Sequence, residues 1–279
     1  MVTQDVPTLV IAVLGLGEAG SAIAHDLVRA GVRVRAYDPA VSAADGITGI
    51  TGITGTASEA EAACGADLVL SVNSAKAAVG AFAAGLPGLR PDALWADLNT
   101  ASPGTKRQLA DIAAAARVSL ADVAMMAPVP GCGLRVPMLA SGEAAARYAA
   151  LLRPLGADIE VLDGPAGLAA SKKLLRSVFY KGMAAAVVEA LDAARAAGDE
   201  PWLRAHIAAE LAAADTGTME RIIDGTRRHA VRRSAEMEAA AGMLTDLGVP
   251  PLMADASRAL HERLARNPAA SPNPPTSQS

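Results

Sequence analysis

The sequence predicts an α/β domain with a doubly wound, mostly parallel sheet, followed by an all-α helical domain. In the first 163 residues, short runs of β-branched and apolar residues alternate with helical patterns, as in sheets that helices cover on both faces. After residue 163 the strand signals end, and alanine-rich helical patterns punctuated by glycine and proline continue to about residue 266. We therefore predict domains at 1–163 and 164–268, and a disordered tail at 269–279.

The first unit, residues 8–38, has the order strand, glycine turn, helix, strand, acid. Apolar residues enter the turn Gly15-x-Gly17-x-x-Gly20, a helical pattern follows it, and the second strand ends at Asp38. In a Rossmann-type unit the first glycine permits the tight turn, the second lets the backbone approach a pyrophosphate, and the third lets helix and strand pack closely. The pyrophosphate binds the N–H groups at the helix start, and the acid accepts hydrogen bonds from the ribose hydroxyls.

This unit predicts that the chain binds a dinucleotide, and the alternative is a structural glycine turn without one. The charge of Asp38 would repel a 2′-phosphate, so we expect NAD, with NADP as the second choice. The cofactor-binding residues predicted here are Gly15, Leu16, Gly17, Glu18, Ala19, Gly20 and Asp38.

The rest of the α/β domain follows in three further stretches. Residues 46–55 read GITGITGITG, which is too short for a repeat architecture, so we interpret it as a glycine-rich loop that leads into a short strand. Strand-then-helix patterns recur at 66–85 and 93–116, and another apolar run spans 118–133. Strands that alternate with helices in this way imply a mostly parallel sheet.

The composition of the chain argues against several classes of protein, namely those that bind nucleic acid, membranes or metal ions. The formal net charge of −4 argues against nucleic acid or an anionic membrane as a partner. No apolar run reaches membrane-spanning length, no signal peptide is evident, and the two cysteines and four histidines show no metal-ligand spacing. We expect a cytoplasmic protein that acts on a small-molecule substrate without a metal. The alanine-rich helices suggest a homodimer that forms through the second domain.

Four segments in this order resemble the β-hydroxyacid dehydrogenase and 6-phosphogluconate dehydrogenase superfamily. They are GLGEAG with the later YDP, then SVNSA, then DLNTASP, which looks like the family's Asp-x-Ser-Thr-x-x-Pro loop, and finally KLLRSVFYKG. The resemblance covers nearly the whole chain, and its second half is most similar to a branch whose second domain has no known function. It implies that Val72 and Asn73 lie along the cofactor, and that Asn99 and Thr100 lie near the nicotinamide.

The same resemblance implies a catalytic lysine at the start of the helical domain. The chain has only five lysines, and three of them fall in the stretch SKKLLRSVFYKG. The related branch places its lysine eight residues before a Lys-Gly pair, and counting back from Lys181-Gly182 gives Lys173. The neighbouring Lys172 and Arg176 would favour a neutral amine, as a general acid/base requires. Lys172 as the catalytic lysine, and a solvated helix face without function, are the alternatives.

The predicted substrate-binding residues surround this lysine. Helical spacing puts Ser177, where the family usually has asparagine, and Tyr180 on the face of Lys173. The family's substrate loop reads approximately Asp-Ala-Pro-Val-Ser-Gly-Gly, whereas the matching stretch here, residues 122–128, lacks the serine. The substrate end near Met126, Ala127 and Pro128 is therefore either apolar or held from elsewhere.

A basic stretch, RRHAVRR at residues 227–233, offers one such place. Read as one helix, it puts His229 and Arg233 on one stripe and Arg228 with Arg232 on another. It is either a solvated face or an anion clamp in which Arg233 binds a substrate carboxylate or phosphate.

The resemblance implies an NAD(P)-dependent oxidoreductase that acts on the alcohol or carbonyl of a small polar metabolite. NAD would accept the hydride, and Lys173 would take the hydroxyl proton. An imine reductase on the same scaffold is the second hypothesis, and a non-catalytic NAD-binding sensor is the third.

Overall fold

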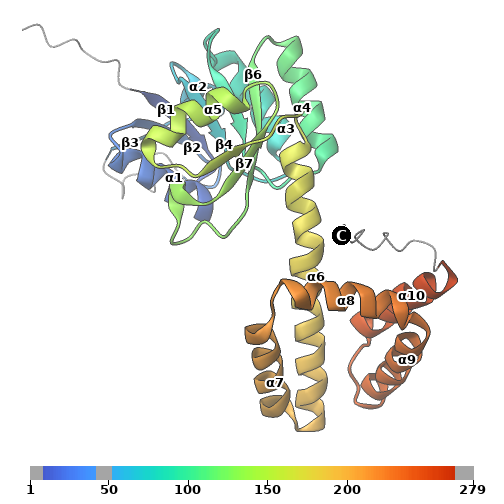
Figure 1. The fold of residues 1–279 in the computed structure, drawn as a ribbon. Coiled ribbons are helices and arrows are strands. Elements are labelled where there is room, and N and C mark those ends of the chain that lie inside the picture. The colour runs from blue at the N-terminus through green and yellow to red at the C-terminus, as the bar shows by residue number, and fades with distance from the viewer. Residues whose placement is uncertain (1–8, 42–51, 268–279) are drawn as a thin grey trace, which may run out of the picture. The chain divides into compact units, whose positions relative to one another are not determined.

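The computed structural model describes residues 9–41 and 52–267. The chain divides into two compact units, Met1–Arg176 and Ser177–Ser279, which are described separately below (Figure 1). The predicted tail at 269–279 and most of the GITGITGITG stretch lie outside the described residues.

The first unit contains a sheet whose eight strands have the spatial order β3-β2-β1-β4-β5-β6-β7-β8. Strands β1 to β6 run parallel to their neighbours, β7 runs antiparallel to β6, and β8 runs parallel to β7. The strands are β1 (Val10–Leu14), β2 (Arg33–Tyr37), β3 (Ile53–Gly55), β4 (Leu68–Ser71), β5 (Leu94–Asp97), β6 (Ser119–Met125), β7 (Met138–Ser141) and β8 (Ile159–Val161). This arrangement confirms the predicted fold class.

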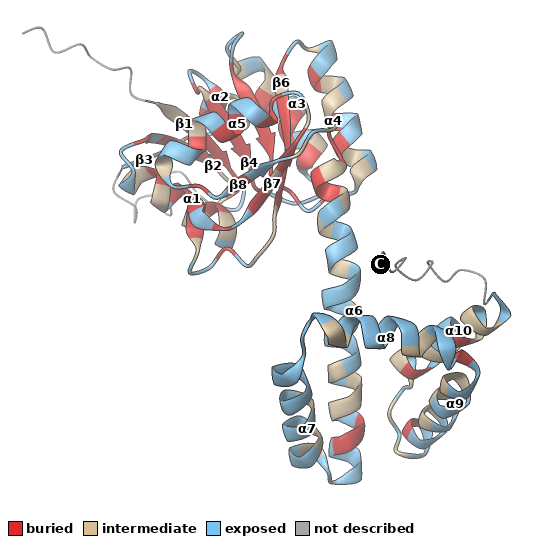
Figure 2. Ribbon diagram, in the orientation of Figure 1, coloured by how far each residue is buried: buried red, intermediate tan, exposed pale blue. Residues whose placement is uncertain are grey.

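Helices cover both faces of the sheet because successive strand residues point to opposite sides. In β1, Ile11 and Val13 pack with α1 and α5, whereas Ala12 and Leu14 pack with α2, α3 and α4. Figure 2 shows these buried residues concentrated in and around the sheet. The helices are α1 (Glu18–Arg29), α2 (Glu59–Ala63), α3 (Ala78–Gly85), α4 (Pro103–Ala115) and α5 (Ala145–Leu152), with 3₁₀ turns at Leu86–Gly88, Gly133–Arg135 and Arg153–Leu155.

The second unit consists of helices in the part of the chain that the structure describes. The long helix α6 (Leu168–Ala197) begins in the first unit and continues into the second, where α7 (Glu200–Ala213), α8 (Thr216–Arg228), α9 (Ala230–Asp246) and α10 (Leu252–Arg266) follow. The carboxylate of Glu189 in α6 accepts the N–H groups of Met253 and Ala254, at 2.8 and 2.9 Å, and so fixes the start of α10. No helix among the described residues is long and apolar enough to span a membrane.

The prediction that RRHAVRR forms one continuous helix is wrong. Helix α8 ends at Arg228 and α9 begins at Ala230, with His229 between them in a non-helical conformation. Arg228 and Arg232 therefore do not share a helix face. The capping box at Asp215 and Thr218 fixes the other end of α8.

Candidate functional site

The turn between β1 and α1 has the geometry that its glycines require. Gly15 has a φ of +98°, and a Cβ there would lie 2.5 Å from the carbonyl oxygen of Val72. A Cβ on Gly20 would overlap the carbonyl oxygen of Gly15, so the third glycine lets the helix pack against the turn as well as against β1. A Cβ on Gly17 would meet no described atom within 4 Å. The space in front of Gly17 is therefore open to a ligand.

Gly17 is also the N-cap of α1 and has no side chain with which to accept the N–H groups of the first turn. These N–H groups, together with the positive end of the helix dipole, form a ready anion site beside the open space at Gly17. The turn therefore fits the pyrophosphate of a dinucleotide.

Asp38 has a structural role that the sequence motif did not reveal. Its Oδ2 accepts the N–H of Leu16 at 2.7 Å, and its Oδ1 accepts the N–H of Ala40 at 2.8 Å. The acid at the end of β2 thus fixes the glycine turn. Each carboxylate oxygen has two acceptor positions, so Asp38 can also accept the hydroxyls of a ribose.

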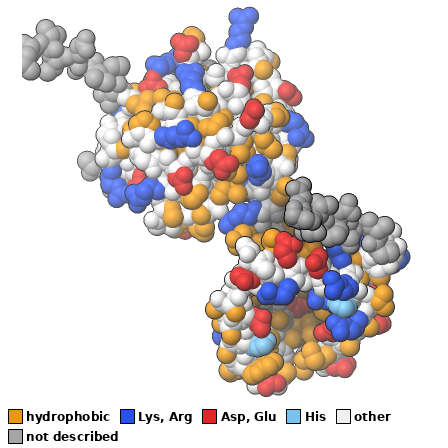
Figure 3. All heavy atoms as spheres, in the orientation of Figure 1, with side chains coloured by type: hydrophobic (Ala, Val, Ile, Leu, Met, Phe, Trp, Pro, Cys, Tyr) orange, Lys and Arg blue, Asp and Glu red, His pale blue; other side chains and the backbone are white. Residues whose placement is uncertain are grey.

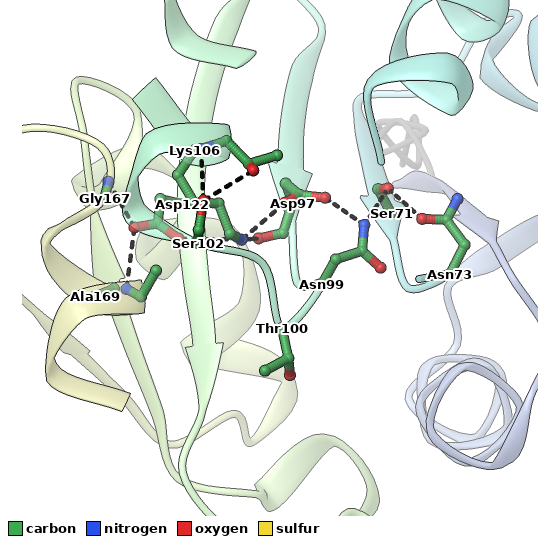
Figure 4. Close-up of polar contacts among 12 residues, drawn as sticks. Ser71, Asn73, Asp97, Asn99, Thr100, Ser102, Lys106, Asp122, Gly167 and Ala169 are labelled. Carbon is green, nitrogen blue, oxygen red and sulfur yellow. Dashed lines mark hydrogen bonds and ion pairs between the residues drawn. The ribbon is translucent and has the colours of Figure 1, made fainter. Parts of the chain in front are cut away.

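A polar network connects the carboxyl ends of β4 and β5 (Figure 4). The side-chain nitrogen of Asn99 donates to Ser71 Oγ at 3.0 Å and to Asp97 Oδ1, and Ser71 Oγ lies 3.2 Å from Asn73 Oδ1. Asn99 is 5% exposed, whereas Asn73 and Thr100 are exposed. The predicted contact residues Val72, Asn73 and Thr100 thus follow two adjacent parallel strands, at the edge where α/β proteins bind ligands.

Lys106 in α4 occupies the centre of a buried charge cluster. Its Nζ lies 2.7 Å from Asp97 Oδ2 and 3.1 Å from Asp122 Oδ1, and the three side chains have no exposed surface. The same Nζ donates to the backbone carbonyl of Asp97 at 2.6 Å. A buried charge is tolerated only when it is paired and hydrogen-bonded, and this lysine holds the ends of β5 and β6 together.

The cluster extends to the start of α6 through Asp122. Its Oδ2 accepts the N–H groups of Gly167 and Ala170, at 2.8 and 3.3 Å, and the hydroxyl of Ser141 at 3.1 Å. These contacts fix the first turn of α6 against the carboxyl edge of the sheet.

Lys173 lies one turn further along α6 and reaches the loop after β5. Its Nζ donates to Thr100 Oγ1 at 2.9 Å. Lys173 is partly buried, whereas Lys172 is exposed. The sequence predicted both Thr100 and Lys173 as site residues, and the structure brings these two side chains together within the first unit.

Residues 10–159 match the family model described as the NAD binding domain of 6-phosphogluconate dehydrogenase. The chain belongs to this family. It is therefore an NAD(P)-dependent oxidoreductase, and the open glycine turn with its N–H groups is consistent with that cofactor. Residues 194–264 match a domain family of unknown function.

Several solved structures are similar to nearly the whole chain. A conserved hypothetical protein from Sinorhizobium meliloti is 32% identical, with 98% of this chain and 92% of that chain covered and a TM-score of 0.59. A conserved protein of unknown function, described as similar to 3-hydroxyacid dehydrogenases, is 26% identical over 94% of this chain and 100% of that chain, with a TM-score of 0.59. An imine reductase from Streptomyces aurantiacus shares the fold at 21% identity over 94% and 96% of the two chains, with a TM-score of 0.78. Among curated proteins, none matches the chain significantly.

The predicted substrate loop of this 6-phosphogluconate dehydrogenase-like protein follows β6. Met126 and Ala127 are partly buried and Pro128 is exposed, while the N–H of Met126 donates to the carbonyl of Pro137 at 2.7 Å. Further along, the N–H of Leu134 donates to Asp26 of α1 at 2.8 Å. The loop is therefore tied down at both ends.

Two opposing effects act on the pKa of the Asp26 carboxyl, which anchors this loop. Burial acts to raise the pKa of its carboxyl, but the N–H of Leu134 and the guanidinium of Arg29 outweigh burial and hold the pKa below its ordinary value. Asp26 therefore remains a charged anchor for the loop at neutral pH.

The remaining predicted site residues, Ser177, Tyr180 and Arg233, belong to the second unit. Arg233 Nη1 donates to Thr226 Oγ1 at 3.0 Å, so this arginine links α9 to α8. The ring of Tyr180 packs edge-on against Phe179, with centroids 5.1 Å apart. Among the described residues, no group of three or more His, Cys, Asp or Glu side chains could hold a metal ion.

Proposed function

We propose that this oxidoreductase transfers a hydride between NAD(P) and the alcohol or carbonyl of a small polar metabolite, with Lys173 as the general acid/base. The observation that supports this proposal is the 2.9 Å hydrogen bond from Lys173 Nζ to Thr100 Oγ1. It puts an amine at the carboxyl edge of the sheet, beside the loop that the family resemblance assigns to the nicotinamide.

In this proposal, separate groups of residues bind the cofactor and transfer the proton. NAD(P), when bound, supplies the hydride acceptor. The N–H groups at the start of α1 hold the pyrophosphate, and Asp38 accepts the hydroxyls of the adenosine ribose. Thr100 orients the amine of Lys173, which takes the proton of the substrate hydroxyl in oxidation and returns it to the carbonyl oxygen in reduction. The same proton transfer serves both directions.

A second candidate, reduction of an imine, is supported by a different observation. Met125 and Met126, the second of which stands where the family's substrate loop has serine, are partly buried and offer an apolar wall. The fold of this chain is also that of an imine reductase. In that reaction Lys173 would donate a proton to the imine nitrogen. A non-catalytic sensor would not need an amine at this position.

Activity assays on two single variants test the proposal. A panel of small hydroxy acids, phosphorylated alcohols and cyclic imines supplies the substrate. Lys173→Ala should lower turnover by about 10²-fold or more, the scale for loss of a general acid/base, while leaving NAD affinity almost unchanged. Lys172→Ala, which removes an exposed lysine from the same turn, is the matched control and should cost much less. The reverse order of damage would make Lys172 the catalytic lysine.

We further propose that the chain forms a homodimer through the helical unit. Among its described residues 177–267, only six are buried, and four of these are alanines. Thirteen large hydrophobic side chains of the same unit are exposed, including Val178, Trp202 and Val231 at 66% to 75%. At on the order of 100 Å² each, they expose roughly 1,300 Å² of apolar surface in total, which exceeds the roughly 800 Å² that one partner contributes to a standard interface.

A cavity of about 460 Å³ between α6, α7, α9 and α10 is part of this surface, and Trp202, Met243 and Leu244 are among the residues that line it. Figure 3 shows hydrophobic side chains lining a hollow in this unit. A second copy of the chain is the occupant we propose. Light scattering should give the mass of a dimer for the natural chain and of a monomer for Trp202→Arg. A monomeric natural chain would overturn the proposal.

A further inference from the structure

The side-chain oxygen of Asn99 is a buried acceptor for which the described residues supply no donor. Oδ1 has no hydrogen-bond partner, although the residue is only 5% exposed. A buried polar atom without a partner is costly, so such atoms are uncommon and require an explanation.

The orientation of this amide is fixed by its surroundings. Asp97 Oδ1 and Ser71 Oγ both lie beside the amide nitrogen, and an ionised carboxylate can only accept hydrogen bonds. Turning the amide over would place its oxygen against the carboxylate of Asp97, so the nitrogen must face Asp97 and the oxygen must face away. Figure 4 shows the oxygen of Asn99 turned away from Asp97 and Ser71.

The buried cluster makes this orientation rigid. The other oxygen of this carboxylate, Asp97 Oδ2, lies 2.7 Å from Lys106 Nζ. The carboxylate that orients Asn99 therefore cannot rotate freely. Ser71, the second partner of the amide nitrogen, is itself fully buried at the end of β4. Oδ1 is therefore a pre-oriented acceptor at the carboxyl edge of the sheet.

We infer that Asn99 Oδ1 accepts an N–H of the carboxamide group of the nicotinamide. This inference rests on the proposed function, in which Lys173 and Thr100 stand at the reacting carbon. In nicotinamide the carboxamide is attached to the ring carbon next to that reacting carbon. Asn99 precedes Thr100 in the same loop, and we take its Oδ1 as the acceptor for the carboxamide when Thr100 and Lys173 stand at the reacting carbon.

This hydrogen bond would fix the orientation of the nicotinamide ring relative to the substrate. A carboxamide held by its N–H cannot rotate freely, and the ring then offers one defined face to the substrate. Asn99 would thus position the nicotinamide, whereas Lys173 moves the proton. The two roles belong to different side chains and can be separated by experiment.

The test uses 3-acetylpyridine adenine dinucleotide, in which a methyl group replaces the NH₂ of the carboxamide. Calorimetry should show that the natural chain binds NAD⁺ about tenfold or more tightly than this analogue, because the analogue leaves Oδ1 unpaired. In Asn99→Leu, which has no acceptor, the two dinucleotides should bind about equally. Binding is measured rather than rate, because the analogue also differs from NAD⁺ in redox potential.

Four outcomes would overturn the inference. The natural chain could bind both dinucleotides alike, Asn99→Leu could keep the preference for NAD⁺, or the variant could lose affinity for both equally, as expected if Asn99 held a ribose hydroxyl. The fourth is that neither dinucleotide binds. Should Asn99→Leu fail to fold, the comparison in the natural chain still decides, and Asn99→Ala, which also has no side-chain acceptor, repeats the variant measurement.

Lys173→Ala separates this inference from the proposed function. It should keep the tenfold preference for NAD⁺ over the analogue and lose turnover. An active Lys173→Ala that still prefers NAD⁺ would contradict the role of the lysine while leaving that of Asn99 in place.

Discussion

Replacing Lys106 with methionine should destabilise the first unit strongly, although methionine fits the volume of the lysine side chain. Because both carboxylates lie about 3 Å from the same Nζ, their nearest oxygens are at most about 6 Å apart. Without the lysine, two like charges at that separation repel by about 3 kcal/mol at an effective dielectric constant of 20. Removing one partner from a buried ion pair costs about 3–5 kcal/mol in general, so both estimates indicate a loss near 3 kcal/mol.

Urea denaturation, followed by circular dichroism, measures this loss. The control is Lys76→Met, which removes an exposed lysine from the same unit and should change stability by less than about 0.5 kcal/mol. Adding Asp122→Asn to the methionine variant removes one of the repelling charges and should recover part of the loss. A Lys106→Met variant as stable as the control would refute the reasoning.

Three further predictions follow from single side chains. Gly17→Val should remain folded, because a Cβ at this position meets no described atom within 4 Å, yet lose dinucleotide binding in calorimetry; unchanged affinity would make the glycine turn purely structural. Asp38 should give tighter binding of NAD than of NADP in parallel titrations, and the opposite preference would contradict its proposed contact with the ribose. The side chains of Arg195 and Arg204 lower the pKa of Glu200 to about 2, so its contribution to stability is present above about pH 4.5 and is lost as the pH falls towards 2. The melting temperature of Glu200→Gln should therefore fall below that of the natural chain near pH 6 and approach it in acid, whereas exposed Glu210→Gln should show little difference at either pH.

Most of the first unit could be predicted from the sequence because its signals are local. The glycine turn, the acid after β2 and the alternation of strands with helices each involve residues close together in the chain. The antiparallel placement of β7 could not be read in this way. Strand direction in a sheet depends on how the chain returns to it. The connection between β6 and β7, residues 126–137, contains no α-helix that would carry the chain back across the sheet, and β7 runs antiparallel to β6.

The Lys106 cluster was missed for a related reason. Its three members come from α4, β5 and β6, and nothing in the spacing of Asp97 and Asp122 shows that their strands are neighbours. A signal was nevertheless present. Lys106 shares a helix face with the buried Leu109 and Ala113, and a lysine at a core position implies a buried acidic partner.

The helical unit was predicted as helices, but the break at His229 was not. No glycine or proline marks it, since Arg228, His229 and Ala230 are all compatible with a helix interior. The break allows both α8 and α9 to contact α10, which is a tertiary effect. The roles of Ser177, Tyr180 and Arg233, and the domain boundaries at 163 and 268, remain predictions from the sequence.

A crystal structure of the chain with NAD⁺ bound tests the central claim most directly. The account predicts that the pyrophosphate lies on the N–H groups at the start of α1, in front of Gly17, and that the nicotinamide ring lies beside Thr100 and Lys173. A dinucleotide bound away from the glycine turn, or a nicotinamide ring out of reach of Lys173, would contradict it.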